Sequence, residues 1–501
     1  MRTKSTIINF ITDALPQVLI LILGLFKSKC FIQILGSNQL GLYQLYGQIV
    51  AYLVLIEGGV GSALLFRLYK PLKEKNNEAI SSIMSASKII FRIIGCLILL
   101  VGFIISFFIG SFIKEATFTF SYMQITFLIY LFSQAVFYFT IPYRTLFEAD
   151  QKRYVPNLVF QITTIVKSLL EIIIVLCGLS LIAILISLSI CSIVANAIII
   201  FAFKKTYRTV SFKSKRDFSM VKDIKDLFIN TLGNLISNNI DILIISKFLG
   251  LNFVVIYSTY NYFVEGIKQF IDKITGATMS GVGDLLLDDA NKSKKVFNEF
   301  NEFVFFVASI ICVPMFICIN KFIEIWYKGN IPVSFWLAAL FTIILFYQIT
   351  RIPLKVFTLS SGKFKEVKRF VIMEVIVNLV LSLVFVKHIG IAGVLLATVI
   401  SLYTTDWLTK PFVIYKQIFM KNPCEYYIKY MINTLFIIIV TTSLYILIPK
   451  SYSNIFSCLL VGVVITIINS LITIVYYYLT KQLTFISRFS YSRKGGNGNE
   501  N

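Results

Sequence analysis

Long apolar stretches dominate the chain, and short polar segments separate them. About fourteen of these stretches reach roughly 20 residues or more, the length that a helix needs to cross about 30 Å of hydrocarbon. The predicted spans are Ile7–Leu35, Leu42–Leu65, Ile89–Ile113, Phe118–Leu146, Tyr154–Cys177, Ser180–Phe203, Phe228–Leu249, Phe253–Leu286, Phe300–Ile319, Phe335–Val356, Phe370–Val386, Ile391–Tyr415, Ile428–Leu447 and Ile455–Leu479. The pattern therefore predicts an all-α integral membrane protein.

Composition agrees with this prediction, and the distribution of charge argues against nucleic-acid binding. The 501 residues are 57% hydrophobic and 14% charged, whereas a soluble protein carries roughly 25% charged residues. The net charge of +22 would suit nucleic acid if the basic residues gathered on one face. Instead they recur in alternate loops, with about 35 Lys and Arg on one side and about 5 on the other. This predicts a multi-pass protein of the cell membrane with both termini cytoplasmic and basic loops against membrane lipids.

An internal repeat indicates how the spans are organised. The segments Leu35–Tyr46 and Leu249–Tyr260 share Leu, Gly, Asn, Tyr and Tyr at one constant offset. An even number of spans separates them, so the halves would be parallel repeats about an axis along the membrane normal. The predicted parts are a six-helix bundle (1–203), a basic cytoplasmic linker (204–227), a second six-helix bundle (228–416), two further helices (417–480) and a cytoplasmic tail (481–501).

Ionisable residues inside the spans are the strongest indication of function. Each would cost about 2.5–3.5 kcal/mol facing lipid at mid-depth, so they are expected to face protein or water. Asn230, Asn234, Asn238 and Asp241 follow one helix face, as do Asn261, Glu265, Lys268 and Asp272, and also Asn9, Asp13 and Gln17. These stripes predict a wet cavity walled by both halves. The predicted cavity acids or ion-coupling residues are Asp13, Glu57, Asp241, Glu265 and Asp272, and Glu374 and Asp406 are further acids within the spans.

Other interpretations of these residues stay open. Lys167 and Glu171 can form a structural ion pair, because they lie four residues apart on one helix. Arg92 and Lys29 lie near helix ends and can reach the interface. The stripes can also be polar contacts between packed helices. No catalytic, metal or cofactor site is predicted, since the one histidine, His388, falls in a turn and the eight cysteines lack metal-ligand spacing.

Two motifs carry a resemblance to a known family. They are Glu57-Gly58-Gly59-Val60-Gly61-Ser62-Ala63 with Leu68–Leu72, and Ile236–Asp241 with Ile244–Gly250 and Tyr257–Tyr262. Together with the number of spans and the charge alternation, they resemble Wzx-type polysaccharide flippases of the multidrug/oligosaccharidyl-lipid/polysaccharide (MOP) exporter superfamily. The chain departs from the family pattern at Gly58, where that pattern has leucine.

The resemblance implies a MOP/MATE-like fold, with two six-helix bundles around a V-shaped cavity and two extra C-terminal helices. It also implies that undecaprenyl-pyrophosphate-linked oligosaccharides move from the cytoplasmic to the outer leaflet by alternating access, for O-antigen or capsule assembly. Glycosyltransferases and a polysaccharide polymerase would be partners of such a flippase. No nucleic acid is expected as a partner.

Basic residues in the cavity suit a diphosphate, because its charge cannot enter hydrocarbon. The candidates for holding the diphosphate or glycan are Lys27, Lys268, Lys273, Lys29, Arg92, Lys167, Asn234, Asn238 and Asn261. Asp241 and Glu265 are the candidates for carrying H⁺ or Na⁺ during resetting, because they lie on the polar stripes.

Three rival functions remain. A cation-coupled multidrug exporter of the same superfamily would favour an acidic cavity. A membrane-embedded polysaccharide polymerase or ligase would need a large outside loop to hold its catalytic groups. A scaffold without transport would leave the intramembrane charges unexplained.

Overall fold

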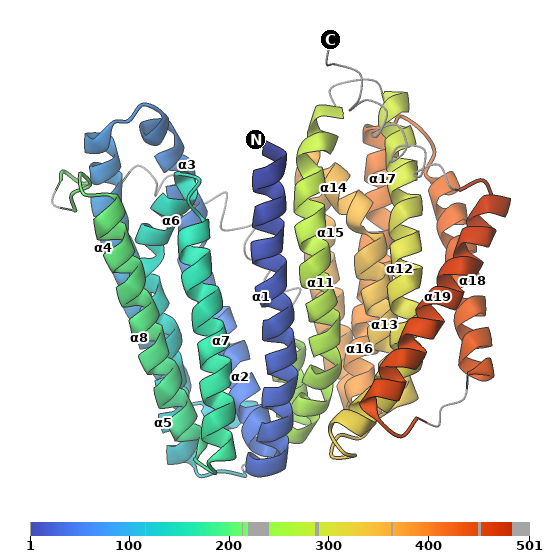
Figure 1. Ribbon diagram of the computed structural model, residues 1–501, viewed down its shortest axis with the longest axis horizontal. Coiled ribbons are helices and arrows are strands. Elements are labelled where there is room, and N and C mark those ends of the chain that lie inside the picture. Colours follow the sequence, from blue (N-terminus) through green and yellow to red (C-terminus); the bar gives the residue numbers. More distant parts are fainter. Residues whose placement is uncertain are drawn as a thin grey trace. The chain divides into compact units, whose positions relative to one another are not determined.

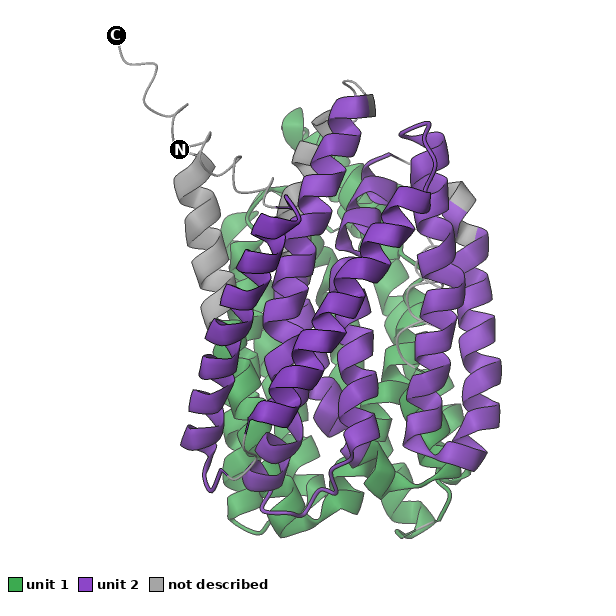
Figure 2. Ribbon diagram, turned by 90° about the vertical axis from the view of Figure 1, so that its right-hand side faces the viewer, with its two compact units in different colours: residues 1–255 green, residues 256–501 purple. Residues whose placement is uncertain are grey.

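A computed structural model describes residues 2–115, 117–212, 214–218, 240–285, 290–361, 364–448 and 452–482. Within these ranges the side chains of 2–15, 272–285, 290, 364–366 and 368 are left undescribed. The chain divides into two compact units, Met1–Val255 and Ile256–Asn501, which Figure 2 colours separately. The predicted boundaries at 203, 228 and 416 stay predictions.

Unit 1 is built from helices (Figure 1). Their bounds are α1 Arg2–Cys30, η1 Phe31–Leu35, α2 Ser37–Leu53, η2 Val54–Glu57, α3 Val60–Lys73, α4 Asn77–Ser106, η3 Ile109–Phe112, α5 Phe120–Ala135, η4 Val136–Thr140, α6 Ile141–Ala149, α7 Tyr154–Leu176, α8 Leu181–Thr206 and α10 Asp241–Phe248. Helix α7 lies between α1 and α8, α8 packs on α5, and α3 packs on both α4 and α6. Helix α10 lies against α2.

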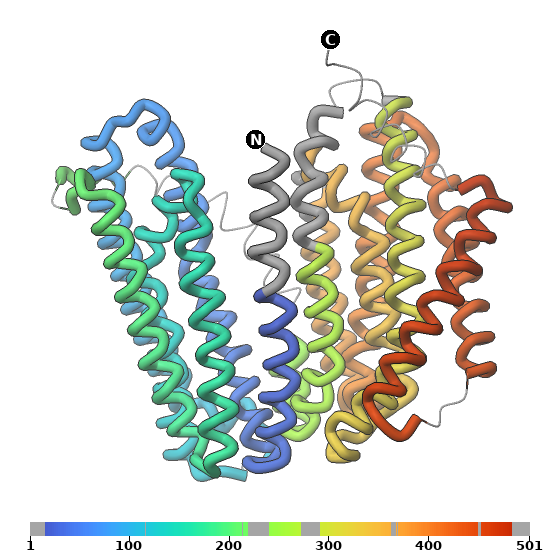
Figure 3. The backbone as a smooth tube through the Cα atoms, in the orientation of Figure 1, coloured from blue at the N-terminus to red at the C-terminus, as the bar shows by residue number. Residues whose placement is uncertain are grey.

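Unit 2 continues from within α11 to the end of the chain, and the tube in Figure 3 ends with α18 and α19 in red. Its helices are α11 Leu251–Leu285, α12 Ala290–Trp326, α13 Phe335–Thr350, α14 Ile352–Ser360, α15 Phe364–Ile389, α16 Ile391–Ser401, η6 Leu402–Trp407, α17 Leu408–Gln417, α18 Cys424–Leu447 and α19 Ile455–Leu479. Helix α12 contacts α13, α18 and α19, while α16 packs on α13 and α15.

Membrane-spanning character is confirmed for most of the predicted spans. Among the described residues, 12 helical segments are long and apolar enough to cross a membrane. They correspond to the predicted spans one to six and nine to fourteen. The eighth span is α11, which is not among the 12 segments and which carries Asn261, Glu265 and Lys268. The seventh falls largely on residues 219–239, outside the described ranges, and α10 forms its end. The protein is thus a multi-pass, all-α membrane protein.

The two turns of the predicted repeat have a glycine with positive φ and a buried tyrosine in common. Gly36 and Gly250 occupy equivalent positions, and both have positive φ, at 86° and 109°. Tyr46 and Tyr260 are also equivalent, and both are 0% exposed. The Tyr46 hydroxyl donates to the Met123 carbonyl at 2.8 Å, and the Tyr260 hydroxyl donates to Asn320 Oδ1 at 2.6 Å. A buried phenol needs such a partner, which is a backbone carbonyl for Tyr46 and a side-chain amide for Tyr260.

A second pair of equivalent features lies within the fourth and tenth spans. Each span is interrupted, and a nine-residue helix follows: α6 begins Ile141-Pro142, and α14 begins Ile352-Pro353. Proline has no N–H and favours the first turn of a helix, so the Ile-Pro pair marks the restart of the helix in both places. A basic residue follows two positions after the proline in each copy, Arg144 in α6 and Lys355 in α14.

The last two helices are held to α12 by buried polar contacts. Lys429 Nζ of α18 pairs with Glu302 Oε1 of α12 at 2.7 Å. Asn469 of α19 is 0% exposed and donates from Nδ2 to the Ser309 carbonyl of α12 at 3.0 Å. These bonds are directional, so they fix one register of α18 and α19 on unit 2.

Candidate functional site

Unit 1 contains a cavity of about 360 Å³ among α2, η2, α5, η4 and α6. Its lining residues are Gly47, Val50, Ala51, Val54, Glu57, Tyr130, Gln134, Phe137, Tyr138, Ile141 and Arg144. The volume falls within the range of about 300–1,000 Å³ that is usual for small-molecule sites. A largely apolar and aromatic wall with a few polar groups is also usual for such sites.

Glu57 is the acid of this cavity, and the local backbone holds it there. Helix η2 ends at Glu57, and Gly58 and Gly59 follow with φ of 60° and 83°. Glycine adopts this left-handed conformation without strain, which gives the departure from the family pattern at Gly58 a physical reason. A Cβ on Gly61 would lie 2.7 Å from Glu57 Oε1, so the first turn of α3 leaves room for the carboxylate. A helix N-terminus stabilises negative charge.

Arg144 is the base of the cavity, and the sequence-based prediction did not include it. Its Nη2 donates to the Phe137 carbonyl at 3.3 Å, and its guanidinium lies 4.8 Å from the centre of the Phe160 ring. Its Nε is buried and has no hydrogen-bond partner among the residues that the structure describes. No ion pair joins Arg144 to Glu57 in the described part of the chain, although both line the cavity. The cavity thus offers a cation and an anion that do not neutralise each other by contact.

The expected pair of Lys167 with Glu171 is not formed. Glu171 Oε2 of α7 pairs instead with Lys27 Nζ of α1 at 2.8 Å, and Tyr43 donates a hydrogen bond to Glu171 Oε1 at 3.2 Å. Lys167 donates to Ser192 Oγ of α8 at 2.9 Å and lies 4.9 Å from the Phe137 ring centre. The spacing of four residues allowed the local pair, but the packing of α1 on α7 offers Glu171 a lysine from another helix.

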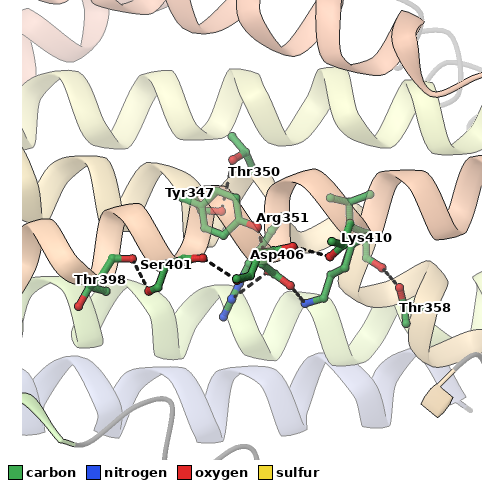
Figure 4. Close-up of polar contacts among 11 residues, drawn as sticks. Tyr347, Thr350, Arg351, Thr358, Thr398, Ser401, Asp406 and Lys410 are labelled. Atoms are coloured by element: carbon green, nitrogen blue, oxygen red, sulfur yellow. Dashed lines mark hydrogen bonds and ion pairs between the residues drawn. The ribbon is translucent and has the colours of Figure 1, made fainter. Parts of the chain in front are cut away.

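Unit 2 contains a buried cluster of charges around Asp406 of η6 (Figure 4). Lys410 Nζ lies 2.5 Å from Asp406 Oδ1, and Arg351 Nη1 lies 3.5 Å from Oδ2. Tyr347 donates its hydroxyl to Oδ2 at 2.8 Å. The Asp406 side chain is 2% exposed, whereas those of Arg351 and Lys410 are 23% and 14% exposed. Two bases thus contact one acid in this cluster.

Helix interruptions bring the members of this cluster together. Arg351 lies between α13 and α14, and Asp406 lies in the π-helical segment η6 between α16 and α17. Single π-turns within helices often occur at functional sites. Asp406 was predicted as an intramembrane acid, whereas Arg351 and Lys410 were overlooked although they also fall inside predicted spans.

The remaining predicted residues fall into three groups. Lys268 Nζ pairs with Glu265 Oε1 at 3.0 Å on α11, Asn261 is half-buried on the same helix, Lys29 is half-buried on α1, and Arg92 is exposed on α4. Asp241 begins α10. Asp13, Asp272 and Lys273 lie on α1 and α11 with undescribed side chains, and Asn234 and Asn238 lie outside the described residues. Their convergence on one cavity, and ion coupling by Asp241 and Glu265, stay predictions.

No group of three or more His, Cys, Asp or Glu in the described residues is placed to hold a metal ion. The comparisons with known proteins rest on structure alone, because no family model and no curated protein sequence matches the chain.

Solved structures do match, along most of the chain. The lipid II flippase MurJ in an inward closed conformation aligns with a TM-score of 0.65 at 17% identity, covering 93% of this chain and 99% of MurJ. An inward-facing multidrug resistance MATE family transporter of the MOP superfamily gives 0.62 at 13%, covering 79% and 93%. A point mutant of the Vibrio cholerae MATE transporter VcmN gives 0.55 at 14%, covering 84% and 100%. The structural neighbours are transporters, and the chain has the MOP/MATE-like fold that MurJ and the MATE proteins share.

Proposed function

We propose that this protein is a transporter that moves undecaprenyl-pyrophosphate-linked oligosaccharides from the cytoplasmic to the outer leaflet by alternating access. The fold supports transport, and the match to MurJ, a lipid II flippase, spans nearly the whole chain. MATE transporters share the same fold, so the choice between a lipid-linked anion and a cationic drug depends on the chemistry of the sites.

The observation that carries the proposal is the presence of two bases, Arg351 and Lys410, at one buried acid, Asp406. Arg351 and Lys410 share one carboxylate, and both keep part of their side chains exposed. A charge inside a membrane span costs about 2.5–3.5 kcal/mol unless it faces water or a partner. Two bases at one carboxylate suit an anionic diphosphate better than a cationic drug. Arginine and lysine are the residues that bind phosphate oxygens most effectively.

The chemistry of the cargo explains why a protein is needed. The diphosphate and the sugar hydroxyls lose their hydrogen bonds to water if they enter hydrocarbon, while the prenyl chain can remain in lipid. The transporter therefore has to shield only the polar head. We expect glycosyltransferases to supply this substrate at the inner face and a polysaccharide polymerase to consume it outside.

The proposal is tested by replacing Lys410 with glutamine in cells that depend on the protein for surface polysaccharide. Asp406 keeps Arg351 as a partner, so the substitution removes one positive charge without leaving a lone buried carboxylate. We expect surface polysaccharide synthesis to fall about tenfold, the effect of losing one charge-assisted contact, and lipid-linked oligosaccharide to accumulate inside.

The matched control is Lys416→Gln, which removes an exposed lysine from the same helix, α17. It should behave like the wild type. Unchanged polysaccharide in the Lys410→Gln cells, or a deletion strain that becomes sensitive to cationic dyes while its polysaccharide is normal, would favour a drug exporter instead.

A further inference from the structure

The cavity of unit 1 differs in charge from the Asp406 cluster. Glu57 and Arg144 contribute one charge of each sign, and the other lining residues are uncharged. One charge of each sign leaves the lining without net charge, so the cavity does not select a diphosphate or a cationic drug by its overall charge. Its polar groups can instead hydrogen-bond an uncharged ligand that has many hydroxyl groups. We propose that this cavity binds a sugar ring of the cargo, an inference that rests on the proposed function.

The aromatic residues of the cavity suit a sugar. Tyr130, Phe137 and Tyr138 line it from α5 and η4. Tyr130 packs edge-on against Tyr43 with ring centroids 5.5 Å apart, and Phe137 packs against Phe160 at 5.5 Å, so neighbouring rings fix their positions. Aromatic side chains provide rigid apolar surfaces, which match the C–H faces of a pyranose ring.

The polar residues supply the other half of sugar recognition. The Glu57 carboxylate accepts hydrogen bonds, the Arg144 guanidinium donates them, and the Gln134 amide can do both. Gln134 donates from Nε2 to Ser133 Oγ at 3.2 Å, which anchors its amide at the cavity wall. Together these three residues offer the donors and acceptors that sugar hydroxyls need.

The size of the cavity limits how much of the cargo it can hold. A volume of about 360 Å³ lies at the lower end of the range for small-molecule sites. It suits a monosaccharide or a disaccharide, not a whole repeat unit. The cavity would thus recognise part of the glycan, and the diphosphate would bind at a positively charged site elsewhere.

The test compares the binding of two lipids to the purified full-length protein in nanodiscs. One is the lipid-linked oligosaccharide extracted from the cell that makes the protein, and the other is undecaprenyl pyrophosphate without sugar. The variants are Ala51→Leu, which fills the cavity, and Gln134→Ala, which removes a polar contact. Gln124→Ala is the matched control, because Gln124 is a half-buried glutamine of the same helix that does not line the cavity.

We expect the wild type to bind the glycan lipid more tightly than the sugarless lipid. Ala51→Leu and Gln134→Ala should lower the affinity for the glycan lipid about fivefold to tenfold and leave the sugarless lipid unchanged. Equal affinity of the wild type for both lipids, or variants that weaken both lipids alike, would overturn the sugar site while the proposed function stands. Loss of ethidium binding in Ala51→Leu would assign the cavity to cations and overturn it too. Failure of the wild type to bind either lipid would refute the proposed function itself.

Discussion

Replacing Glu171 with leucine removes the acidic member of the ion pair between α1 and α7. The Lys27–Glu171 pair joins Nζ to Oε2 at 2.8 Å, and the Glu171 side chain is 3% exposed. The lysine side chain is 22% exposed, so it has little water to replace the carboxylate. Breaking a buried pair on one side costs about 3–5 kcal/mol, because the remaining charge stays buried and unpaired. We expect a loss of stability of about that size.

The reciprocal change, Lys27→Met, leaves the Glu171 carboxylate, the more deeply buried of the two charges, without its lysine. That carboxylate keeps the Tyr43 hydroxyl as a hydrogen-bond donor, which compensates for only part of the lost ammonium. We expect a destabilisation in the same range of about 3–5 kcal/mol. The double variant Lys27→Met/Glu171→Leu removes both charges, and such replacements are often neutral or stabilising by about 1–4 kcal/mol. The two single costs should therefore be strongly non-additive.

The assay is reversible unfolding of the purified protein in mixed micelles, followed by helical signal as the fraction of denaturing detergent rises. The wild type, the two single variants and the double variant are measured under one condition, and transport by each protein is measured in parallel. Additive costs in the double variant would show that the two side chains do not interact as the structure has them. If the double variant is stable and still transports, Lys27 holds the fold and is not a ligand of the diphosphate.

Three further changes test other parts of the structure. Asp406→Asn leaves two bases of the cluster without their acid and should cost about 3–5 kcal/mol in the same unfolding assay; an unaltered midpoint would contradict the cluster. Gly41→Val should lower the melting temperature, because a Cβ there would collide with the Leu251 carbonyl; a melting temperature equal to that of the wild type would mean that this close contact is not made. Asn469→Leu should cost about 1–3 kcal/mol, because the Ser309 carbonyl on α12 loses its buried donor; the argument fails if α19 resists proteolysis as well as in the wild type.

The spans were predictable because the period and length of apolar stretches depend only on local sequence. The same holds for the repeated turns, where Gly36 and Gly250 stand at positions with positive φ. Glu57 could also be identified from the sequence as an acid within a span, and it lines the cavity of unit 1. Each of these features follows from residues close together in the chain.

The partners of the buried charges could not be predicted in this way. Helix spacing pointed to Lys167 for Glu171, but the choice of Lys27 depends on how α1 packs on α7. Arg144 was hidden near the end of a predicted span, where a basic side chain ordinarily reaches the interface. A signal was present, because Arg144 and Lys355 follow an Ile-Pro pair at the same spacing in the two halves. The repeated Ile-Pro pair marks the places where the fourth and tenth spans are interrupted.

The central claim is that the protein carries an anionic, lipid-linked glycan across the bilayer. The most direct measurement reconstitutes the purified protein in liposomes that hold fluorescent undecaprenyl-pyrophosphate oligosaccharide in one leaflet, and follows its appearance in the other with a membrane-impermeant quencher. We predict transfer well above that of protein-free liposomes, with a marked reduction by Lys410→Gln and none by Lys416→Gln. Transfer no faster than in protein-free liposomes, together with uptake of ethidium by the same vesicles, would contradict the account.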